Sequence, residues 1–133
     1  MEASDALSDL TEISSQIEAA VLFDTNGEVA ASTLDDGRSR RLVEGARALL
    51  DAAEGIRSAG KAVAQLEVGT PEGSVFVVRD GERLALATTG PEPTVGLVFY
   101  DLKTCLRNSR PERAKTATRR GSATKAGTDD ASA

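Results

Sequence analysis

Histidine is absent from the 133-residue sequence, and this absence excludes several kinds of active site. Ser-His-Asp and Cys-His machinery and histidine metal sites all need an imidazole. Cysteine occurs once, as Cys105, so neither an intramolecular disulfide nor a multi-cysteine zinc site can form. We therefore expect no histidine-based catalytic site, no metal or other cofactor, and a reducing, cytoplasmic location. Carboxylate pairs such as Asp35-Asp36 remain, but beside a helix start they are interpreted as caps.

Aromatic residues and long apolar runs are also scarce. Aromatic side chains make up 3% of the chain, so the expected core is aliphatic. No apolar run approaches the ~20 residues that cross a bilayer. The first five residues are acidic where a signal peptide would be positive, so neither secretion nor membrane insertion is expected.

Charge is divided unevenly along the chain. From Ser109 onward, six basic and three acidic residues give +3, whereas the part through Asn108, with ten basic and eighteen acidic residues, carries -8. An acidic body of this kind repels phosphate backbones, so we expect no nucleic-acid partner.

Hydrophobic periodicity divides the chain into three helices and five strands. Leu7, Leu10, Ile13 (or Ser14) and Ile17 follow a helical spacing after Ser4, the expected N-cap. The predicted helices cover 4–18, a segment that Asp35-Asp36-Gly37 introduces and that stops near Gly60, and 95–108. The predicted strands cover 19–23, 28–32, 61–68, 74–79 and 83–89. Short, turn-rich joins between the last three strands favour an antiparallel meander.

The order α-β-β-α-β-β-β-α predicts an α+β fold, in which a five-stranded, mainly antiparallel sheet has helices on both faces. The first and fourth strands are apolar on both faces and are expected to be covered on both sides. The third strand alternates apolar and polar residues, which suits a sheet edge. Residues 1–108 form the predicted domain, and 109–133 form a disordered basic tail without hydrophobic periodicity. Arg119-Arg120-Gly121-Ser122 in this tail resembles a basophilic kinase site.

Two segments resemble ligand-binding loops, and we interpret both as structural. Residues 55–62 match a phosphate-binding loop except at Ala62, which lacks the magnesium-binding hydroxyl. This segment also runs from a helix into a strand, so Gly60 is predicted as a helix C-cap. Asp24, Asn26 and Glu28 alternate as in a calcium loop, but the position that needs glycine holds valine, and a hairpin turn is predicted.

Two further features remain as candidates for function. Cys105 lies near the edge of the third helix's apolar stripe with only Lys103 and Arg107 nearby to lower its pKa, and inert packing is predicted. Arg38, Arg40 and Arg41 form a basic cluster at the start of the second helix. This cluster is either a contact for an acidic partner surface or a solvated helix face.

The sequence from about Leu7 to Leu106 resembles the roadblock/dynein light chain family, including its bacterial MglB-like members. The resemblance lies in Leu7-Ser8-Asp9-Leu10, in the strand-hairpin-strand unit of residues 19–31, in the long Ala- and Leu-rich second helix and in the three-strand meander. A hydrophobic strand followed by an Asp-x-x-Gly hairpin also occurs in profilin-like and longin-like domains.

The resemblance implies a dimer, with itself or with another roadblock chain, in which the third strands pair and the second helices pack side by side. The contacts would then fall on Leu42, Ala46, Leu49, Leu50, Val63, Gln65 and Glu67. The resemblance also implies a small Ras-like GTPase as partner, regulated or scaffolded without catalysis, with Arg38, Arg40 and Arg41 as candidate partner contacts. An adaptor that binds larger assemblies regardless of nucleotide is the alternative, and a small-ligand sensor ranks last because the core offers no polar groups to orient a ligand.

Overall fold

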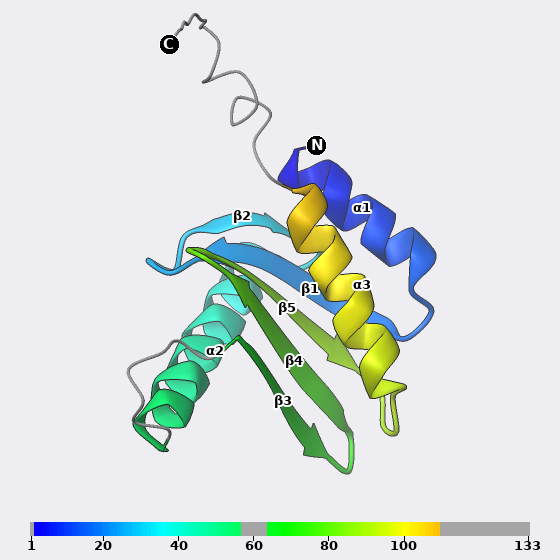
Figure 1. Cartoon of the computed structure of the whole chain (residues 1–133). Coiled ribbons are helices and arrows are strands. Elements are labelled where there is room, and N and C mark those ends of the chain that lie inside the picture. Colours follow the sequence, from blue (N-terminus) through cyan, green and yellow to red (C-terminus); the bar gives the residue numbers. More distant parts are fainter. Residues whose placement is uncertain (1, 57–63, 110–133) are drawn as a thin grey trace, which may run out of the picture.

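The computed structural model describes residues 2–56 and 64–109. Its elements occur in the predicted order (Figure 1). They are α1 (Ala3–Ile13), β1 (Ile17–Asp24), β2 (Val29–Ser32), α2 (Asp36–Ile56), β3 (Gln65–Thr70), β4 (Gly73–Asp80), β5 (Arg83–Thr89) and α3 (Val95–Asn108). The tail predicted for 109–133 and the segment 57–63 lie outside the described residues, apart from Ser109.

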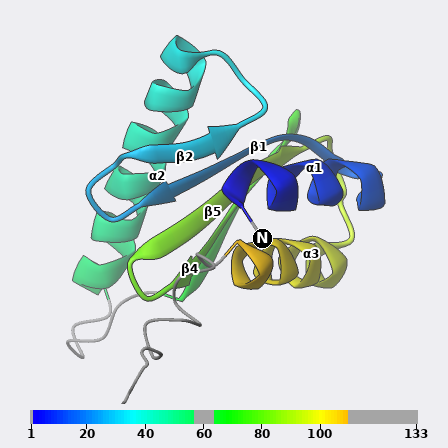
Figure 2. The same cartoon turned by 90° about the horizontal axis from the view of Figure 1, so that it is seen from above.

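The five strands form one sheet in the order β2-β1-β5-β4-β3, and every neighbouring pair is antiparallel. Helices α1 and α3 lie side by side on one face, and α2 covers the other (Figure 2). The predicted fold class is therefore confirmed. The half-polar third strand lies at a sheet edge, also as predicted.

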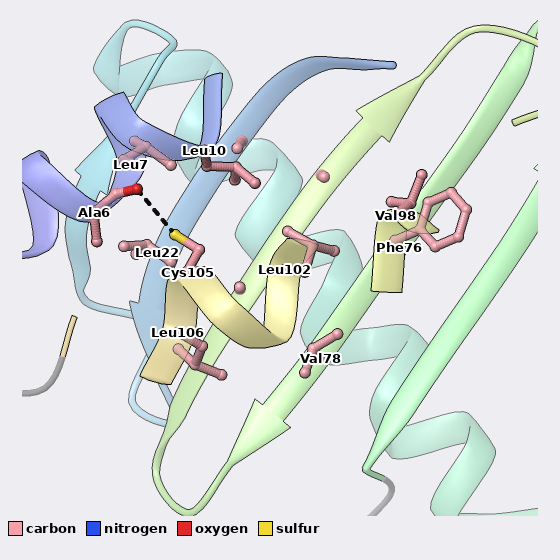
Figure 3. Packing of buried hydrophobic residues seen from close by; sticks show 13 residues of the cluster. Ala6, Leu7, Leu10, Leu22, Phe76, Val78, Val98, Leu102, Cys105 and Leu106 are labelled. Atoms are coloured by element: carbon pink, nitrogen blue, oxygen red, sulfur yellow. Dashed lines mark hydrogen bonds between the residues drawn. The ribbon is translucent and has the colours of Figure 1, made fainter. Parts of the chain in front are cut away.

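The larger core lies between the sheet and the α1–α3 pair (Figure 3). It is mainly aliphatic, and its largest member, Phe76, is completely buried and meets Phe99 edge to face at a centroid distance of 5.0 Å. The buried members are Ala6, Leu7, Leu10, Ala20, Leu22, Phe76, Val78, Ala85, Ala87, Val98, Leu102, Cys105 and Leu106. All three central strands contribute, so this core fixes the position of α3 relative to β4.

The second core lies between the sheet and α2. It consists of Val21, Phe23, Val43, Ala46, Leu50, Val77, Leu84 and Leu86. Successive residues of β1 and β4 alternate between the two cores, because side chains of a strand point to opposite faces. This explains why both strands are apolar at nearly every position, as the sequence predicted.

The first helix differs from its predicted range of 4–18. It ends at Ile13, its N-cap position is Glu2 and not Ser4, and no side chain caps it. Ser14 is extended, and Ile17 already pairs with Thr89 of β5 as the first residue of β1. Pairing with the sheet therefore outweighs the helical spacing of Ile17.

The turn between β1 and β2 is a hairpin turn, as predicted. Asp24 Oδ1 accepts hydrogen bonds from the backbone N–H groups of Asn26 (2.9 Å) and Glu28 (3.0 Å). A two-residue Asn-Gly hairpin turn ordinarily has both residues at positive φ, but here only Gly27, at φ 88°, adopts it. Asp24 is thus an acceptor for the turn's backbone, and the calcium-loop interpretation has no support in this geometry.

The remaining boundaries mostly agree with the sequence. Helix α3 begins after Thr94 and ends at Asn108, as predicted, although the Thr94 side chain makes no capping hydrogen bond. Gly55, the first residue of the rejected phosphate-loop match, lies inside α2. Gly60, the predicted end of this helix, lies outside the described residues.

The thiol of Cys105 is buried in the α1–α3 core, with Sγ 3.5 Å from the carbonyl oxygen of Ala6 (Figure 3). Burial raises its pKa to about 11, and the charge of Asp9 acts in the same direction. The cation that opposes this rise is Arg83 of β5, and not Lys103 or Arg107 as the sequence suggested.

We expect Cys105 to be nearly unreactive in the native protein. At pH 8, a thiol with a pKa near 11 has about 100-fold less thiolate than one at the ordinary value, and burial blocks access further. Absorbance assays with a disulfide reagent should show modification slower by at least this factor in native than in denatured protein. Equal rates in the two states would show that the thiol is accessible.

Candidate interaction surface

Strand β3 offers a free backbone edge. It pairs with β4 on one side, and on the other side no strand pairs with it among the described residues. The register Gln65↔Val78 and Glu67↔Phe76 places both polar side chains on the α3 face of the sheet, where they are exposed. Val63, predicted as a contact on this strand, lies outside the described residues.

Helix α2 uses one face for the core of its own chain. Ser39, Val43, Ala46 and Leu50 are buried, and the Ser39 hydroxyl lies 2.6 Å from that of Ser32, which satisfies it. Two predicted dimer contacts, Ala46 and Leu50, therefore point into the core and are not available to a partner. Val43, which was not among the predicted contacts of this helix, lies at the centre of this buried face.

A second face of α2 is exposed and carries small and apolar residues. Gly45, Leu49, Ala52 and Ile56 follow one another at steps of four, three and four residues, which places them on one side of a helix. Leu49 is 36% exposed and Ile56 80%. Leu42 lies between the two faces and is half-buried against the core. The spacing of the sequence contains this exposed stripe. The predicted contacts of this helix, however, combined buried positions with exposed ones in a single set.

The exposed stripe lies on the side of α2 that faces away from the β1–β2 hairpin. Arg47 lies on the opposite side of α2, where its guanidinium approaches Gly27 in the β1–β2 hairpin. Leu49 is about 200° around the helix from Arg47, since each residue turns an α-helix by about 100°. Leu42 and Leu66 of β3 both pack against the α2-side core. The α2 stripe therefore lies on the side of the helix away from the β1–β2 hairpin, and Leu66 brings β3 into contact with the same core that α2 covers.

The three arginines at the start of α2 are exposed but are not equivalent. Arg38 is held by Asp35, which accepts hydrogen bonds from the Arg38 backbone N–H (2.8 Å) and Nε (3.0 Å). These bonds, the backbone one foremost, hold the pKa of Asp35 below its ordinary value. Arg38 and Arg41 lie on the side of the exposed stripe, whereas Arg40 projects about 100° or more away from it.

The described residues show no built site for a small ligand or metal ion. Two surface hollows, of about 330 and 280 Å³, are open grooves beside α1 and beside the C-terminal half of α3. No group of three or more cysteine, aspartate or glutamate side chains within 2–56 and 64–109 is arranged to hold a metal. No helix of this part of the chain is long and apolar enough to cross a membrane.

The sequence matches no protein-family model, and no curated protein matches it significantly. The structure, in contrast, is similar to several solved structures. A Roadblock/LC7 domain from Streptomyces avermitilis is 22% identical, covers 84% of this chain and 97% of its own, and has a TM-score of 0.73. The gliding protein MglB of Thermus thermophilus is 15% identical, with 80% and 84% covered and a TM-score of 0.68. MglB of Myxococcus xanthus is 14% identical, with 79% and 85% covered and a TM-score of 0.61.

The chain therefore has the fold of the Roadblock/LC7 domains. The resemblance predicted from the hairpin unit, the long second helix and the three-strand meander is confirmed at the level of the fold. The β3 edge and the exposed α2 stripe have no partner among the described residues of the chain.

Proposed function

We propose that this protein is a non-enzymatic, dimeric regulator or scaffold of a small Ras-like GTPase. The observation that carries the proposal is the surface formed by the β3 edge and the α2 stripe. Support for the GTPase comes from the roadblock fold and from the likeness to MglB, a gliding protein in the solved structure from Thermus thermophilus. One solved MglB structure has a tetrameric arrangement, which supports self-association as a property to test in this chain.

In the proposed homodimer, the β3 edges of two copies pair and the α2 stripes meet across the two-fold axis. Strand pairing satisfies backbone groups that an exposed edge leaves to water, and it protects the edge from aggregation. Gly45 and Ala52 let the two helices approach closely because neither carries a large side chain. The space beside Gly45 is open in the single chain, since a Cβ added there meets nothing within 4 Å. Leu49 and Ile56 then become buried, which supplies the apolar contribution to association.

The arginines at the start of α2 are the proposed GTPase contacts. Arg38 and Arg41 lie on the stripe side near one end of α2, so a dimer places two such pairs around its helical face. Their charge contrasts with a body that carries -8 through Asn108, and it suits an acidic partner surface. Because a regulator of this kind acts by binding and positioning, it needs no catalytic side chain of its own.

Affinity capture with the full chain tests the proposed function. Native lysate is passed over the immobilised protein with GDP or with a non-hydrolysable GTP analogue, and retained proteins are identified by mass spectrometry. We expect a Ras-like GTPase to be retained with one nucleotide and not with the other. Capture of larger proteins regardless of nucleotide would favour the adaptor, and retention of no GTPase under either condition would contradict the proposal.

Replacing both arginines by glutamine should weaken this capture. R38Q/R41Q removes two positive charges per copy from the edge of the proposed GTPase interface. We expect the affinity for the GTPase to fall about 3- to 10-fold, mainly through slower association. Surface plasmon resonance with the captured GTPase measures both rates. The matched control is R47Q, on the opposite side of the same helix, which should leave both rates unchanged. Equal effects of the two variants would show that the contact is not at these arginines.

A further inference from the structure

Four large apolar side chains are exposed together at one end of the α1–α3 pair. Ile13 is 72% exposed at the end of α1, and Val95 (39%), Leu97 (49%) and Tyr100 (64%) lie in the first half of α3. We call these four residues the α1–α3 patch. Among the described residues seven large hydrophobic side chains are exposed, and of the other three, two belong to the α2 stripe and one to β2. Apolar side chains that are exposed as a group mark an interaction site.

The antiparallel packing of α1 and α3 brings these side chains to the same place (Figure 2). The Sγ of Cys105 lies 3.5 Å from a carbonyl oxygen in the first half of α1. About two helical turns from this contact, Ile13 of α1 and Leu97 of α3 lie opposite each other. Just beyond them, the Thr94 backbone N–H donates a hydrogen bond to Gln16 Oε1 at 2.6 Å. The apolar ends of the two helices therefore form one continuous surface.

The part of the molecule that carries the patch has no positive charge close by in sequence. Residues 2–37 and 84–102 contain nine and two acidic residues, respectively, and no Lys or Arg. These ranges include α1, β1, β2 and the first half of α3. The nearest cation on α3 is Lys103, one turn after Tyr100, on the side of the helix that faces β3. The patch is thus bordered by negative charge toward α1 and by one positive charge toward β3.

Two carboxylates border the patch along the seam between the helices. Asp9 lies one turn before Ile13, and it is close enough to Cys105 to raise the pKa of this thiol. Asp101 lies one turn after Leu97 and one turn before Cys105, so it faces the same seam. It is half-buried, and this burial raises the pKa of its carboxyl. Neither carboxylate forms an ion pair with another described residue.

The charge decides between the possible occupants of the patch. A second copy of this chain would place the same carboxylates opposite each other across a two-fold axis. A membrane surface with anionic lipids has a negative potential and would repel them as well. The occupant must therefore combine an apolar face with positive charge.

The patch also indicates the backbone conformation of its occupant. Helices α1 and α3 satisfy their own backbone groups, so this surface offers no free strand edge to an extended chain. A helix brings a backbone that is already hydrogen-bonded. Its side chains at i, i+3 and i+4 can pack between Ile13 on one side and the row of Leu97 and Tyr100 on the other.

We infer that the α1–α3 patch binds a basic amphipathic helix of a partner protein. The apolar face of this helix covers the patch, and its Lys or Arg side chains pair with Asp9 and Asp101 along the seam. Lys103 repels cations on the opposite side, so the helix binds in one orientation. The patch lies on the sheet face opposite α2. Binding there is therefore separate from the proposed GTPase contact, and the two can be tested independently.

Titration of the isotopically labelled full-length protein with a synthetic peptide tests the inference by NMR. The probe consists of about 14 Leu and Lys residues, with Leu at i, i+3, i+4 and i+7. We expect the amide signals of residues 9–16 and 94–104 to shift, those of α2 to stay in place, and the dissociation constant to be about 10–100 µM. Two control peptides should bind at least about 10-fold more weakly. One has Glu in place of every Lys, and the other has a central Pro, which prevents a continuous helix.

Two variants separate the apolar and the charged contributions. L97Q/Y100Q removes exposed apolar side chains, so the fold should be retained and the affinity for the Leu-Lys peptide should fall at least about 10-fold. D9N/D101N should lower this affinity about 3- to 10-fold. The matched controls are V29Q, at an exposed apolar residue of β2, and E44Q/D51N, at exposed carboxylates of α2. Both should leave the affinity unchanged.

Several results would overturn the inference. The first is the absence of any shift at about 1 mM Leu-Lys peptide, which is far above the expected dissociation constant. Shifts that centre on α2, or an affinity that L97Q/Y100Q leaves unchanged, would show that the patch is not the binding site. Equal binding of the Glu peptide would contradict the charge preference, and equal binding of the Pro peptide would contradict a helical occupant.

Discussion

Replacement of Gly73 by alanine is expected to lower the free energy of unfolding by about 3 kcal/mol, near the upper end of single-substitution effects. Gly73 begins β4 at φ 156°, and a Cβ placed there would overlap the backbone oxygen of Thr89 on β5. Because the obstacle is backbone and not a flexible side chain, the β4–β5 pairing itself must shift. Thermal and denaturant unfolding of the purified variant measures this loss.

Gly69 provides the matched control for this substitution. It lies in β3, in the same hairpin, but a Cβ there would make only ordinary contacts, at 3.6 Å, with side chains of Glu67 and Ser74. We expect Gly69→Ala to change the free energy of unfolding by no more than about 0.5 kcal/mol. Similar losses for Gly69→Ala and Gly73→Ala would show that the close approach of Gly73 to β5 is not what constrains this position.

The double substitution L49E/I56E should convert the proposed dimer into a monomer. Both side chains are exposed in the single chain, so their replacement should leave the fold intact, but in the dimer it would bury charges beside a two-fold axis. Together with the lost apolar burial, we expect the dissociation constant of the dimer to rise at least about 100-fold. Sedimentation velocity over a range of concentrations measures the change.

A pair of exposed apolar residues on the other face of the sheet serves as control. Leu97 is 49% exposed and Tyr100 64%, and both lie on α3. L97E/Y100E changes charge by the same amount as L49E/I56E but away from the α2 stripe. We expect it to leave the dissociation constant unchanged. A dimer that dissociates with this control variant and persists with L49E/I56E would place the interface on the α1–α3 face.

The sequence alone was enough to predict the element order, the antiparallel sheet and the edge position of β3. The start of helix α3 at Val95 was predicted correctly because its apolar spacing begins directly after a Gly- and Pro-rich break. Helix α1 was predicted too long because Ile17 continues the helical spacing and also begins the alternation of β1. Its pairing with Thr89, which is distant in sequence, decides between the two.

The candidate interface was predicted only in part, and the reason is geometrical. Leu42 and Val43 are neighbours of similar hydrophobicity, and the sequence does not indicate which of them faces the sheet. Once Val43 takes the buried position, Ala46 and Leu50 follow it into the core, and the exposed stripe moves to Gly45, Leu49, Ala52 and Ile56. The position of α1 beside the end of α3 likewise follows from tertiary packing.

Hydrogen exchange at the β3 backbone tests the proposed interface most directly. Edge amides of Gln65–Thr70 that do not bond to β4 point to solvent in a single chain and become paired when two β3 strands meet. Exchange is followed by NMR or mass spectrometry at protein concentrations above and below the dissociation constant. If the strands pair, these amides exchange at least about 10-fold more slowly at high concentration, and L49E/I56E removes this protection. If sedimentation shows that the protein is dimeric and the β3 edge amides nevertheless exchange equally fast above and below the dissociation constant, pairing through β3 is contradicted.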